Sequence, residues 1–465
     1  MADVVTLLVT GYDTSVATLG NAVAVLAAHE AGRRALMADP SLVPRAADEL
    51  IRFDVAGQVV FRHALEATQV GSRPIEAGAT VALLIGAANR DPEEFDAPDS
   101  LDLTRQRGLP PRVLAVSIPK KSGGQRILGV PTVSDRIAQM VVKQLIEPDL
   151  DPVFLPDSDG YRPRKSALGA VGVTRERCWK YDWVLEFDIK GLFDNIDHEL
   201  LLRAVRKHVK CAWSLLYIER WLTAPMERDG IRLERNRGTP QGGVISPILS
   251  NLFLHYTFDL WMRRTHPDLP WCRYADDGQV HCRTEQEAEA LKAELQARLA
   301  ECRLELHPTK TKIVYCRDER RREPYPNVAF DFLGYCFRPR AVWGSRSGRL
   351  FCDYTPAVSP SALKAMREKI RELNIRRQTQ LSLDEIAGRL NPLLQGWIQY
   401  DGRFTPSALH PVLRYVNQTL LAWAMRKFKR FATHKIRASQ FLQRLARDNP
   451  DLLIHWRLGL TSTFA

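Results

Sequence analysis

Cysteine is scarce in this chain and is never found in pairs. Its eight cysteines stand singly among 465 residues, with no Cys-x-x-Cys motif. That spacing excludes the usual zinc-site and disulfide patterns, so we expect isolated buried thiols and a reducing cytoplasm. The sequence also has no run of about 20 apolar residues, and its first apolar stretch follows no basic leader. We therefore expect neither a membrane span nor a signal peptide.

Lysine is missing from the first 119 residues, and cysteine from the first 177. Residues 1–107 contain nine Arg against fifteen Asp and Glu, a net charge of −6, whereas the rest of the chain carries +18. This change of usage, close to the Arg-Gly-Leu-Pro-Pro at 107–111, predicts a junction between sequences of different origin at 105–111. The basic part favours a polyanion partner such as nucleic acid, although a solvated basic surface is the alternative.

The acidic part is predicted to contain helices at 4–28 and 41–53 and short strands at 59–63 and 80–85. Three of its motifs are Thr-Gly-Tyr-Asp-Thr at 10–14, Glu-Leu-Ile-Arg at 49–52 and Ala-Ala-Asn-Arg-Asp-Pro at 87–92. Together they resemble an internal piece of bacterial cytochrome P-450 monooxygenases. The resemblance implies an Asp-Thr pair over the haem and a structural Glu-Arg salt bridge.

The haem ligand of that family has no counterpart in this part of the chain. The family holds its iron through a cysteine thiolate in a loop shortly after the Asp-Pro segment, and here no cysteine precedes Cys178. Without the thiolate the iron site cannot form. We expect no haem and no monooxygenase activity.

A carboxylate ends a strand-like pattern at residues 183–189, Trp-Val-Leu-Glu-Phe-Asp-Ile. Alternation places the apolar residues 183, 185, 187 and 189 on one face and Asp188 on the other. The pattern predicts a half-buried strand with a carboxylate at its end.

Two adjacent acids, Asp276 and Asp277, stand in Tyr-Ala-Asp-Asp-Gly at 274–278, between a second pair of strand patterns. Acids before a glycine at this place predict a hairpin turn that displays both carboxylates. Three such oxygen ligands suit two Mg²⁺ ions about 3.5–4 Å apart, as nucleotidyl transfer requires. Asp188 and Asp276 would bridge the metals and Asp277 would support them. A surface Asp-Asp turn is the alternative.

Three companion segments favour the polymerase interpretation. The first runs from Asp188 through Phe193 to residue 198. The second is Arg-Gly-Thr-Pro-Gln-Gly-Gly-Val-Ile-Ser-Pro at 237–247, where glycines permit close approach to nucleic acid and Gln241 would contact the nucleotide. The third, at 118–129, predicts a hairpin with a Gly-Gly turn, where Lys120 and Arg126 would grip a triphosphate unless they are only solvated charges.

The C-terminal part predicts three amphipathic helices. The first has Ser359 as N-cap, the second opens with a capping box at 382–385, and the third starts at 405–406. The third runs into a basic stretch interleaved with Phe428 and Phe431, which suits phosphate contacts and stacking on unpaired bases. A solvated basic helix end is the alternative. The candidate RNA-binding residues of this stretch are Arg426, Lys427, Lys429 and Arg430.

Residues 112–340 resemble group II intron-encoded reverse transcriptases over these motifs and over further ones at 135–139, 160–163, 310–313 and 332–335. The resemblance implies that Phe193 lies under the nucleotide sugar and selects deoxynucleotides, with a plain core phenylalanine as the alternative. It also implies that Lys310 reaches the nucleotide. Asn-Pro-Leu-Leu-Gln-Gly-Trp at 391–397 resembles the maturase-specific, thumb-like domain of the family, which clamps primer–template and binds intron RNA. With no His-rich or Cys-paired nuclease segment, the chain most resembles the bacterial class that lacks an endonuclease.

The sequence thus predicts an α+β right-hand polymerase with fingers, palm and helical thumb, preceded by a mainly α partial monooxygenase fragment. We expect the fragment at 1–107, fingers and palm at 108–340, and the thumb or maturase domain at 341–465. The expected function is RNA-directed DNA polymerisation and splicing of a group II intron in the cytoplasm. Its substrates would be intron RNA, DNA primer or target and deoxynucleotides, with two Mg²⁺ ions and no stable protein partner.

The fragment stands where the family places a further RNA-binding finger extension, which suggests a gene fusion. Two alternatives therefore stay open, a catalytically impaired chimera and an RNA-binding splicing chaperone without polymerase activity.

Overall fold

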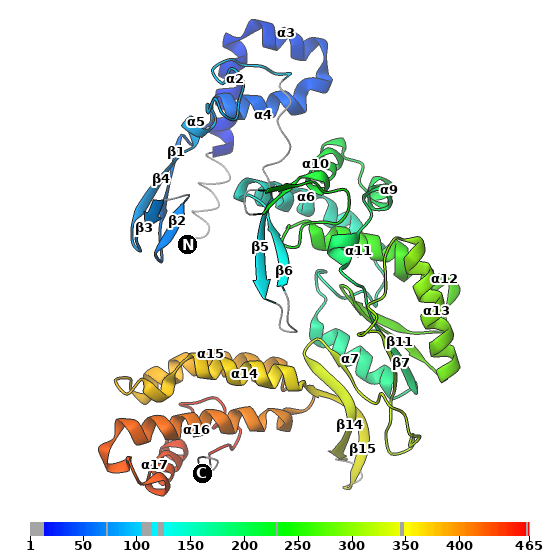
Figure 1. Ribbon diagram of the computed structural model, residues 1–465, viewed down its shortest axis with the longest axis vertical. Coiled ribbons are helices and arrows are strands. Elements are labelled where there is room, and N and C mark those ends of the chain that lie inside the picture. Colours follow the sequence, from blue (N-terminus) through cyan, green and yellow to red (C-terminus); the bar gives the residue numbers. More distant parts are fainter. Residues whose placement is uncertain are drawn as a thin grey trace. The chain divides into compact units, whose positions relative to one another are not determined.

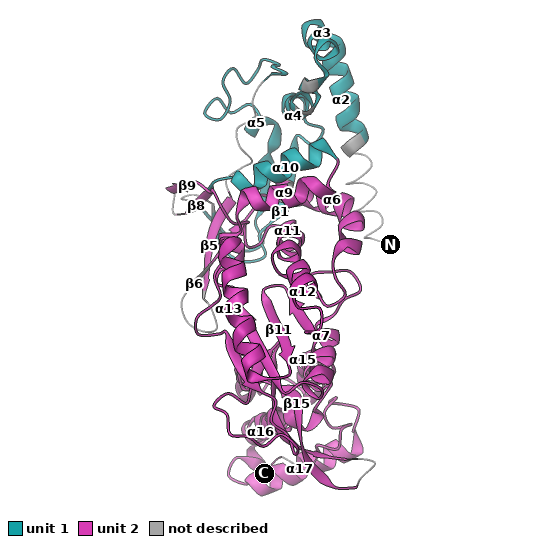
Figure 2. Ribbon diagram, turned by 90° about the vertical axis from the view of Figure 1, so that its right-hand side faces the viewer, with its two compact units in different colours: residues 1–112, 211–225 teal, residues 113–210, 226–465 magenta. Residues whose placement is uncertain are grey.

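The computed structural model describes residues 14–70, 73–104, 113–119, 125–228, 231–344, 348–461 and 464. It divides into two compact units, residues 1–112 with 211–225 and residues 113–210 with 226–465 (Figure 2). The first division lies beside the predicted junction. The return of 211–225 to the first unit was not predicted, and the predicted domain bounds stay a prediction.

The first unit packs short helices on a small apolar core of Val25, Ala46, Leu50 and Leu103. Its helix at 30–38 was not predicted, and residues 10–13 of the first monooxygenase-like motif lie outside the described residues. The helices are α2 (Thr14–Ala28), α3 (Glu30–Ala38), α4 (Val43–Phe53), α5 (Ile85–Ala88) and α10 (Ala212–Thr223). The strands are β1 (Val59–His63), β2 (Thr68–Val70), β3 (Arg73–Ile75) and β4 (Thr80–Leu84), paired as β1–β4 and β2–β3.

A buried salt bridge in this unit confirms the predicted Glu-Arg pair. Arg52 donates from Nε and Nη2 to the two carboxylate oxygens of Glu49, each at 2.8 Å, and both side chains are buried. The remaining guanidinium donors reach the carbonyls of residues 89, 98 and 100. The pair thus ties α4 to the segment that follows α5.

The second unit is built around a four-stranded antiparallel sheet in the order β10-β11-β7-β12. Its two central strands, β11 and β7, are labelled in Figure 1. The prediction that the strand at 183–189 is half-buried was wrong, because nearly every residue of β7 is buried on both faces. Val184 packs against α7, and Phe187 on the opposite face packs against Phe258 with ring centroids 4.9 Å apart. The elements are α7 (Ala167–Cys178), β7 (Trp183–Asp188), β10 (Trp271–Tyr274), β11 (Asp277–Cys282), α13 (Glu285–Glu301) and β12 (Lys312–Tyr315).

A second sheet, in the order β6-β5-β8-β9, contains the predicted hairpin of residues 118–129. Its antiparallel pairing, with Ile118 opposite Arg126, confirms the hairpin, whose tip at 120–124 lies outside the described residues. Its strands are β5 (Val113–Pro119), β6 (Gln125–Val130), β8 (Met226–Arg228) and β9 (Ile231–Leu233). Apart from α7 and α10, the helices within residues 133–265 are α6 (Val133–Leu150), η3 (Asp151–Val153), α8 (Leu192–Asn195), α9 (His198–His208), α11 (Ser246–Leu254), η4 (His255–Asp259) and α12 (Leu260–Thr265).

The C-terminal part contains a three-stranded sheet and a helical bundle with its own core. Ser359 caps α14, and the predicted capping box of Ser382 and Glu385 is present, but a further helix, α17, was not predicted. The strands are β13 (Phe330–Phe332), β14 (Tyr335–Trp343) and β15 (Leu350–Val358). The helices are α14 (Pro360–Glu372), η5 (Ile375–Arg377), α15 (Leu383–Tyr400), η6 (Pro406–Leu409), α16 (His410–Lys427), η7 (Lys429–Phe431) and α17 (Lys435–Asp448).

All eight cysteines are free, and six of them are buried, as expected of isolated thiols. Among the described residues, no helix combines the length and the apolar character that crossing a membrane requires.

Candidate active site

The central sheet brings the separated acidic motifs together. Asp188 is the last residue of β7 and is only 7% exposed. Strands β10 and β11 are joined by a turn at Ala275 and Asp276, and Asp277 pairs with Asp188 as its register partner on β7. The predicted hairpin is therefore present, and it lies directly beside the end of β7. Three carboxylates from two parts of the chain occupy one edge of the sheet.

A lysine from a third segment completes this cluster. Lys310, just before β12, forms an ion pair with Asp188 through its ammonium group. That hydrogen bond raises the pKa of Lys310, and the charges of Asp277 and Asp276 raise it further. The pKa of Asp277 is raised to about 6, first by desolvation among the surrounding protein atoms and then by the charges of Asp276 and Asp188. The carboxylates that raise the pKa of Lys310 also contribute to the raised pKa of Asp277, so negative charge gathers at this edge.

This edge is chemically suited to divalent cations without being a complete protein cage. Among the described residues, no group of three or more His, Cys, Asp or Glu side chains could hold a metal ion by itself. Mg²⁺ typically uses only one or two carboxylates and takes its other ligands from water and substrate phosphates. Desolvation is the main cause of the raised pKa of Asp277, and the charges of Asp276 and Asp188, which a bound cation would offset, raise it further. Hard oxygen donors and unbalanced charge therefore fit Mg²⁺.

A buried arginine, which the sequence did not predict, stabilises the turn that carries Asp276. Arg273, on β10, is fully buried and makes a bidentate salt bridge with the equally buried Asp259, at 2.9 and 2.8 Å. Arg273 also donates from Nη1 to the carbonyl of Ala275, at 3.0 Å. Its remaining donors reach Asn251 at 3.0 Å and Ser158 at 2.7 Å. All the guanidinium donors are thus satisfied without water.

These contacts stabilise an unusual backbone conformation. Ala275 has φ +58, in the left-handed region that non-glycine residues rarely adopt, and such strain persists only where neighbours impose it. Gly160 supplies the second constraint, because a Cβ there would lie 2.3 Å from the backbone nitrogen of Ala275. Asn251 donates to the carbonyl of Gly160 at 2.6 Å. The motif at 160–163 therefore acts as a support for the acidic turn.

The segment at 237–247 packs against α8, where Phe193 lies half-buried. Gln241 donates to both carboxylate oxygens of Asp194, at 3.2 and 3.1 Å. Gly238, with φ +79, could not carry a Cβ, which would lie 2.7 Å from the carbonyl oxygens of Phe193 and Asp194. The absence of a side chain at Gly238 therefore accommodates the chain's own backbone, and the close approach of nucleic acid to the glycines of this segment stays a prediction. Contact of Phe193 or Gln241 with a nucleotide stays a prediction.

The predicted triphosphate grip is only partly described. Lys120 lies outside the described residues, and of Arg126 the structure describes the backbone, which belongs to β6. Their role stays a prediction.

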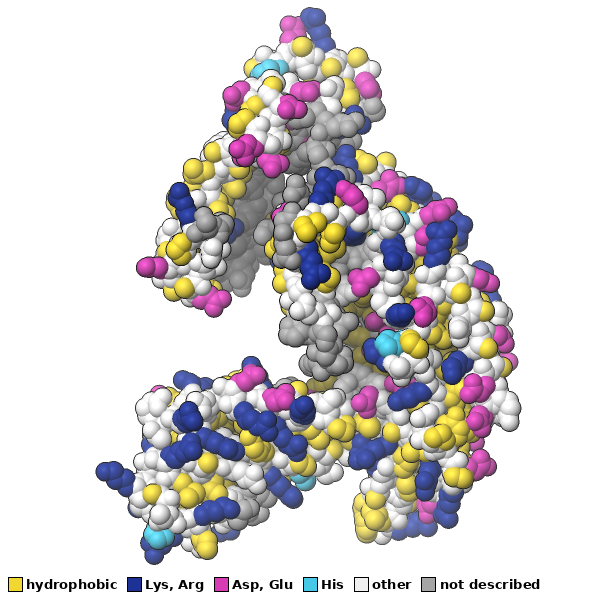
Figure 3. Space-filling view, in the orientation of Figure 1, with side chains coloured by type: hydrophobic (Ala, Val, Ile, Leu, Met, Phe, Trp, Pro, Cys, Tyr) yellow, Lys and Arg dark blue, Asp and Glu magenta, His cyan; other side chains and the backbone are white. Residues whose placement is uncertain are grey.

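The basic stretch that begins in the last turn of α16 makes more contacts within the protein than expected. Lys427 donates to the carbonyl of Leu381 at 2.5 Å and to that of Thr379 at 3.1 Å, so its ammonium stabilises a loop. Phe431 is buried, which excludes the stacking on bases that we expected of it. Arg426 and Lys429 are exposed, as is Arg430, which lies over the Phe431 ring at 4.7 Å. Figure 3 shows Lys and Arg side chains gathered over these C-terminal helices.

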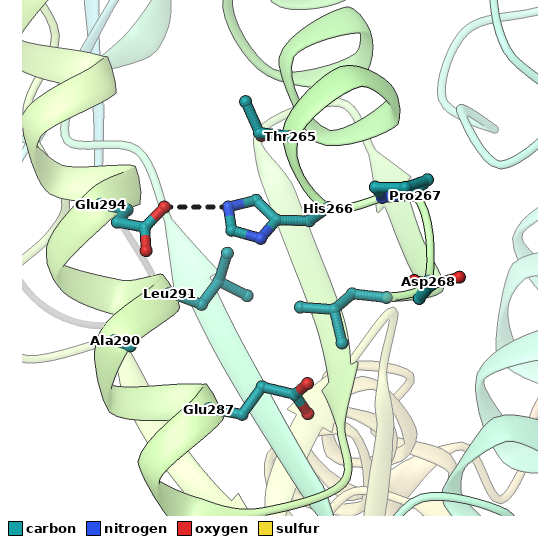
Figure 4. Close-up of a pocket in the computed structure, with 9 residues that line it drawn as sticks. Thr265, His266, Pro267, Asp268, Glu287, Ala290, Leu291 and Glu294 are labelled. Atoms are coloured by element: carbon teal, nitrogen blue, oxygen red, sulfur yellow. Dashed lines mark ion pairs between the residues drawn. The ribbon is translucent and has the colours of Figure 1, made fainter.

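A cavity of about 270 Å³ lies at the other end of β10, away from the carboxylates. In it His266 points toward Glu294 of α13, with Nε2 3.1 Å from the carboxylate (Figure 4). It shares no residue with the acidic edge, and we assign it no part in the chemistry.

Comparison with known proteins agrees with this geometry. The family model of the reverse transcriptases (RNA-dependent DNA polymerases) matches residues 118–337, and that of the group II intron maturase-specific domain matches residues 363–441. Protein YkfC of Escherichia coli is 31% identical over 273 residues, which are 49% of this chain and 68% of YkfC. The chain belongs to the group II intron-encoded reverse transcriptases.

Two further relatives match shorter parts of this chain. The group II intron-encoded protein LtrA of Lactococcus lactis is 36% identical over 136 residues, 29% of this chain and 23% of LtrA. The putative cytochrome P450 133B1 of Xylella fastidiosa is 39% identical over 108 residues, 23% of this chain and 27% of that protein. The chain thus spans about a quarter of each of these two proteins, and its first part is similar to a cytochrome P-450 fragment.

Proposed function

We propose that the chain is an RNA-directed DNA polymerase of a group II intron that also binds the intron RNA and assists its splicing. The observation that carries the proposal is the register of the central sheet, which pairs Asp277 with Asp188 beside the turn that holds Asp276. The two family segments, reverse transcriptase followed by maturase domain, support the same function.

In this proposal Asp188, Asp276 and Asp277 would hold two Mg²⁺ ions. Such ions supply the activation of the primer 3′-hydroxyl and the stabilisation of the pyrophosphate leaving group. Asp188 and Asp276 would ligate the ions, and Asp277 would add negative charge beside them. Lys310 neutralises Asp188 and would pass to the triphosphate when a nucleotide enters. Phe193, Gln241, Lys120 and Arg126 would position that nucleotide, and Phe193 would select deoxynucleotides by its bulk.

The proposed substrates are the intron RNA as template, a DNA primer or target, and deoxynucleotides. We place the protein in the cytoplasm, an interpretation supported by the eight free cysteines. For the fragment at 1–107 we propose no haem and no monooxygenase activity, because no cysteine precedes Cys178.

Primer extension on an RNA template with Mg²⁺ and deoxynucleotides tests the proposal. We expect extension by the wild-type chain, and a loss of at least a thousandfold in Asp276→Asn, which keeps the size of the side chain but removes a charged metal ligand. Asp268→Asn is the matched control, because Asp268 is exposed and lies beyond the other end of β10. Equal extension by wild type and Asp276→Asn would contradict the proposed site.

Splicing assays separate the alternatives. An RNA chaperone without polymerase activity would assist splicing equally with Asp276 or Asn at that position and would extend no primer. An impaired chimera would do neither, because the fragment replaces the RNA-binding finger extension.

A further inference from the structure

A second cavity in the same unit, of about 500 Å³, lies among α9, η4, α12 and α13. These elements are in contact, since η4 packs against α11, α12 and α13, and α9 packs against α11. The cavity shares no residue with the carboxylate edge. Its wall combines cationic with aromatic side chains and includes no acidic residue, and the six that matter here are Arg203, Lys207, Tyr256, Trp261, Arg264 and Arg298.

Local structure explains why these side chains converge. Arg203 and Lys207 are four residues apart on α9 and so lie on one face of the helix. Helices α11 and α12 are joined by η4, which is a π-helix, and π-helical turns are frequent at functional sites. Arg298 stabilises it by donating to the carbonyls of Tyr256 and Thr257, each at 3.0 Å. Tyr256 and Thr257 of this π-helix both line the cavity.

The charges around the cavity are not balanced by the protein. Arg298 has a partner in Glu301, at 2.8 Å, and Lys207 lies 5.1 Å from the centre of the Tyr256 ring. Arg203 and Arg264 are exposed, and neither forms a hydrogen bond or ion pair in the described part of the chain. The dipole of α9 favours a cation in its last turn, which accounts for Lys207 but not for Arg203 in the middle of the helix. Three cations thus surround one cavity without a counter-charge.

The aromatic rings and the volume define the ligand. Tyr256 and Trp261 are half-exposed and both line the cavity. Because Lys207 lies over the Tyr256 ring, Trp261 is the ring on which a base would stack. A cavity of about 500 Å³ is large enough for one nucleotide. We propose that this pocket binds an unpaired nucleotide of structured RNA, with Arg203, Lys207 and Arg264 on the phosphates and Trp261 on the base. The inference deepens the proposed function, since it adds an RNA-anchoring site outside the polymerisation site.

Binding of a radiolabelled RNA hairpin with an unpaired loop, measured over a range of salt concentrations, tests the site. We expect Arg203→Glu/Arg264→Glu to weaken binding at least tenfold and to reduce the slope of log affinity against log salt by about two. Arg317→Glu/Arg320→Glu is the control with the same charge change at exposed residues of this unit, and it should bind like the wild type. Unchanged affinity and slope in the pocket variant would overturn the proposal.

Two further measurements keep the outcome interpretable. Trp261→Ala should weaken binding of the hairpin but not of a blunt RNA duplex, because only the hairpin offers an unpaired base. Equal losses on both RNAs would overturn the assigned stacking. Primer extension on a short unstructured template should be unchanged in Arg203→Glu/Arg264→Glu. If the wild type extends no primer, the proposed polymerase fails, while the binding comparison still decides the pocket.

Discussion

Replacing Asp259 by Asn would leave Arg273 as a buried charge without its counter-charge. The side chains of both residues are fully buried, and the carboxylate accepts two hydrogen bonds at 2.8 and 2.9 Å. Removing one partner of a buried pair typically costs about 3–5 kcal/mol, because the remaining charge is desolvated and uncompensated. We expect Asp259→Asn to lose about this much stability and to melt roughly 5–10 °C lower.

The same substitution should impair catalysis by a route distinct from unfolding. Arg273 holds the carbonyl of Ala275, so a displaced guanidinium would release the strained turn that carries Asp276. We expect the kcat of primer extension, measured well below the melting temperature, to fall at least tenfold with a weaker Mg²⁺ response. A second variant, Ser158→Ala, removes one hydrogen bond from the buried guanidinium of Arg273 but leaves its counter-charge in place, so it should lose about 1.5–3 kcal/mol, less than Asp259→Asn.

Thermal unfolding followed by circular dichroism, with primer extension on the same preparations, decides between these effects. Asp268→Asn, an exposed aspartate in the loop before β10, should match the wild type in both assays. If Asp259→Asn melts within 1–2 °C of the wild type, a difference of at most about 1 kcal/mol, the buried pair does not carry the energy assigned to it. If it melts lower yet keeps the wild-type kcat, the pair stabilises the fold without positioning the turn.

Three further predictions concern the same edge of the sheet. Gly160→Ala would place a Cβ 2.3 Å from the backbone nitrogen of Ala275. We expect a loss of about 1–3 kcal/mol in the free energy of unfolding and at least tenfold lower extension activity. Wild-type values in both assays would contradict the contact. The pKa of Asp277 is raised to about 6, so this carboxyl is ionised above that pH and protonated below it. The Mg²⁺ concentration for half-maximal extension should then rise about tenfold per pH unit below about 6, and Asp277→Asn should lose this dependence. For folding the sign is opposite, since a raised carboxyl pKa contributes stability below pH 3.8 that is lost as the pH rises through about 6. Lys310→Met removes the cation paired with Asp188. Steady-state kinetics should then show that less Mg²⁺ is required and that the KM for deoxynucleotides is raised several-fold. Unchanged constants would show that this ion pair has no role in the reaction.

Local patterns predicted the parts of the fold that short-range chemistry controls. The acidic hairpin, the capping box of Ser382 and Glu385, and the buried Glu49–Arg52 pair are all present, because each depends on residues within a few positions of one another. The prediction for β7 failed on burial. Alternation indicated one covered face, whereas α7 covers the second face, and periodicity carries no information about which helix packs there.

The sequence by itself determined that the chain joins a basic polymerase to a fragment of different origin. It also determined that Asp188 ends one strand pattern and that Asp276 and Asp277 lie where a turn joins two others. Strand alternation and turn residues depend on near neighbours in the chain, so residue type and spacing were enough to predict these positions. Only the tertiary structure decided how those aspartates are held, by Arg273 against Asp259 and by Lys310 across 122 positions from Asp188. It also decided that Lys427 stabilises a loop while Arg203 and Arg264 face an open pocket. A charged side chain looks the same in the sequence whether it is buried and paired or exposed and free, because that difference arises only when distant segments pack together.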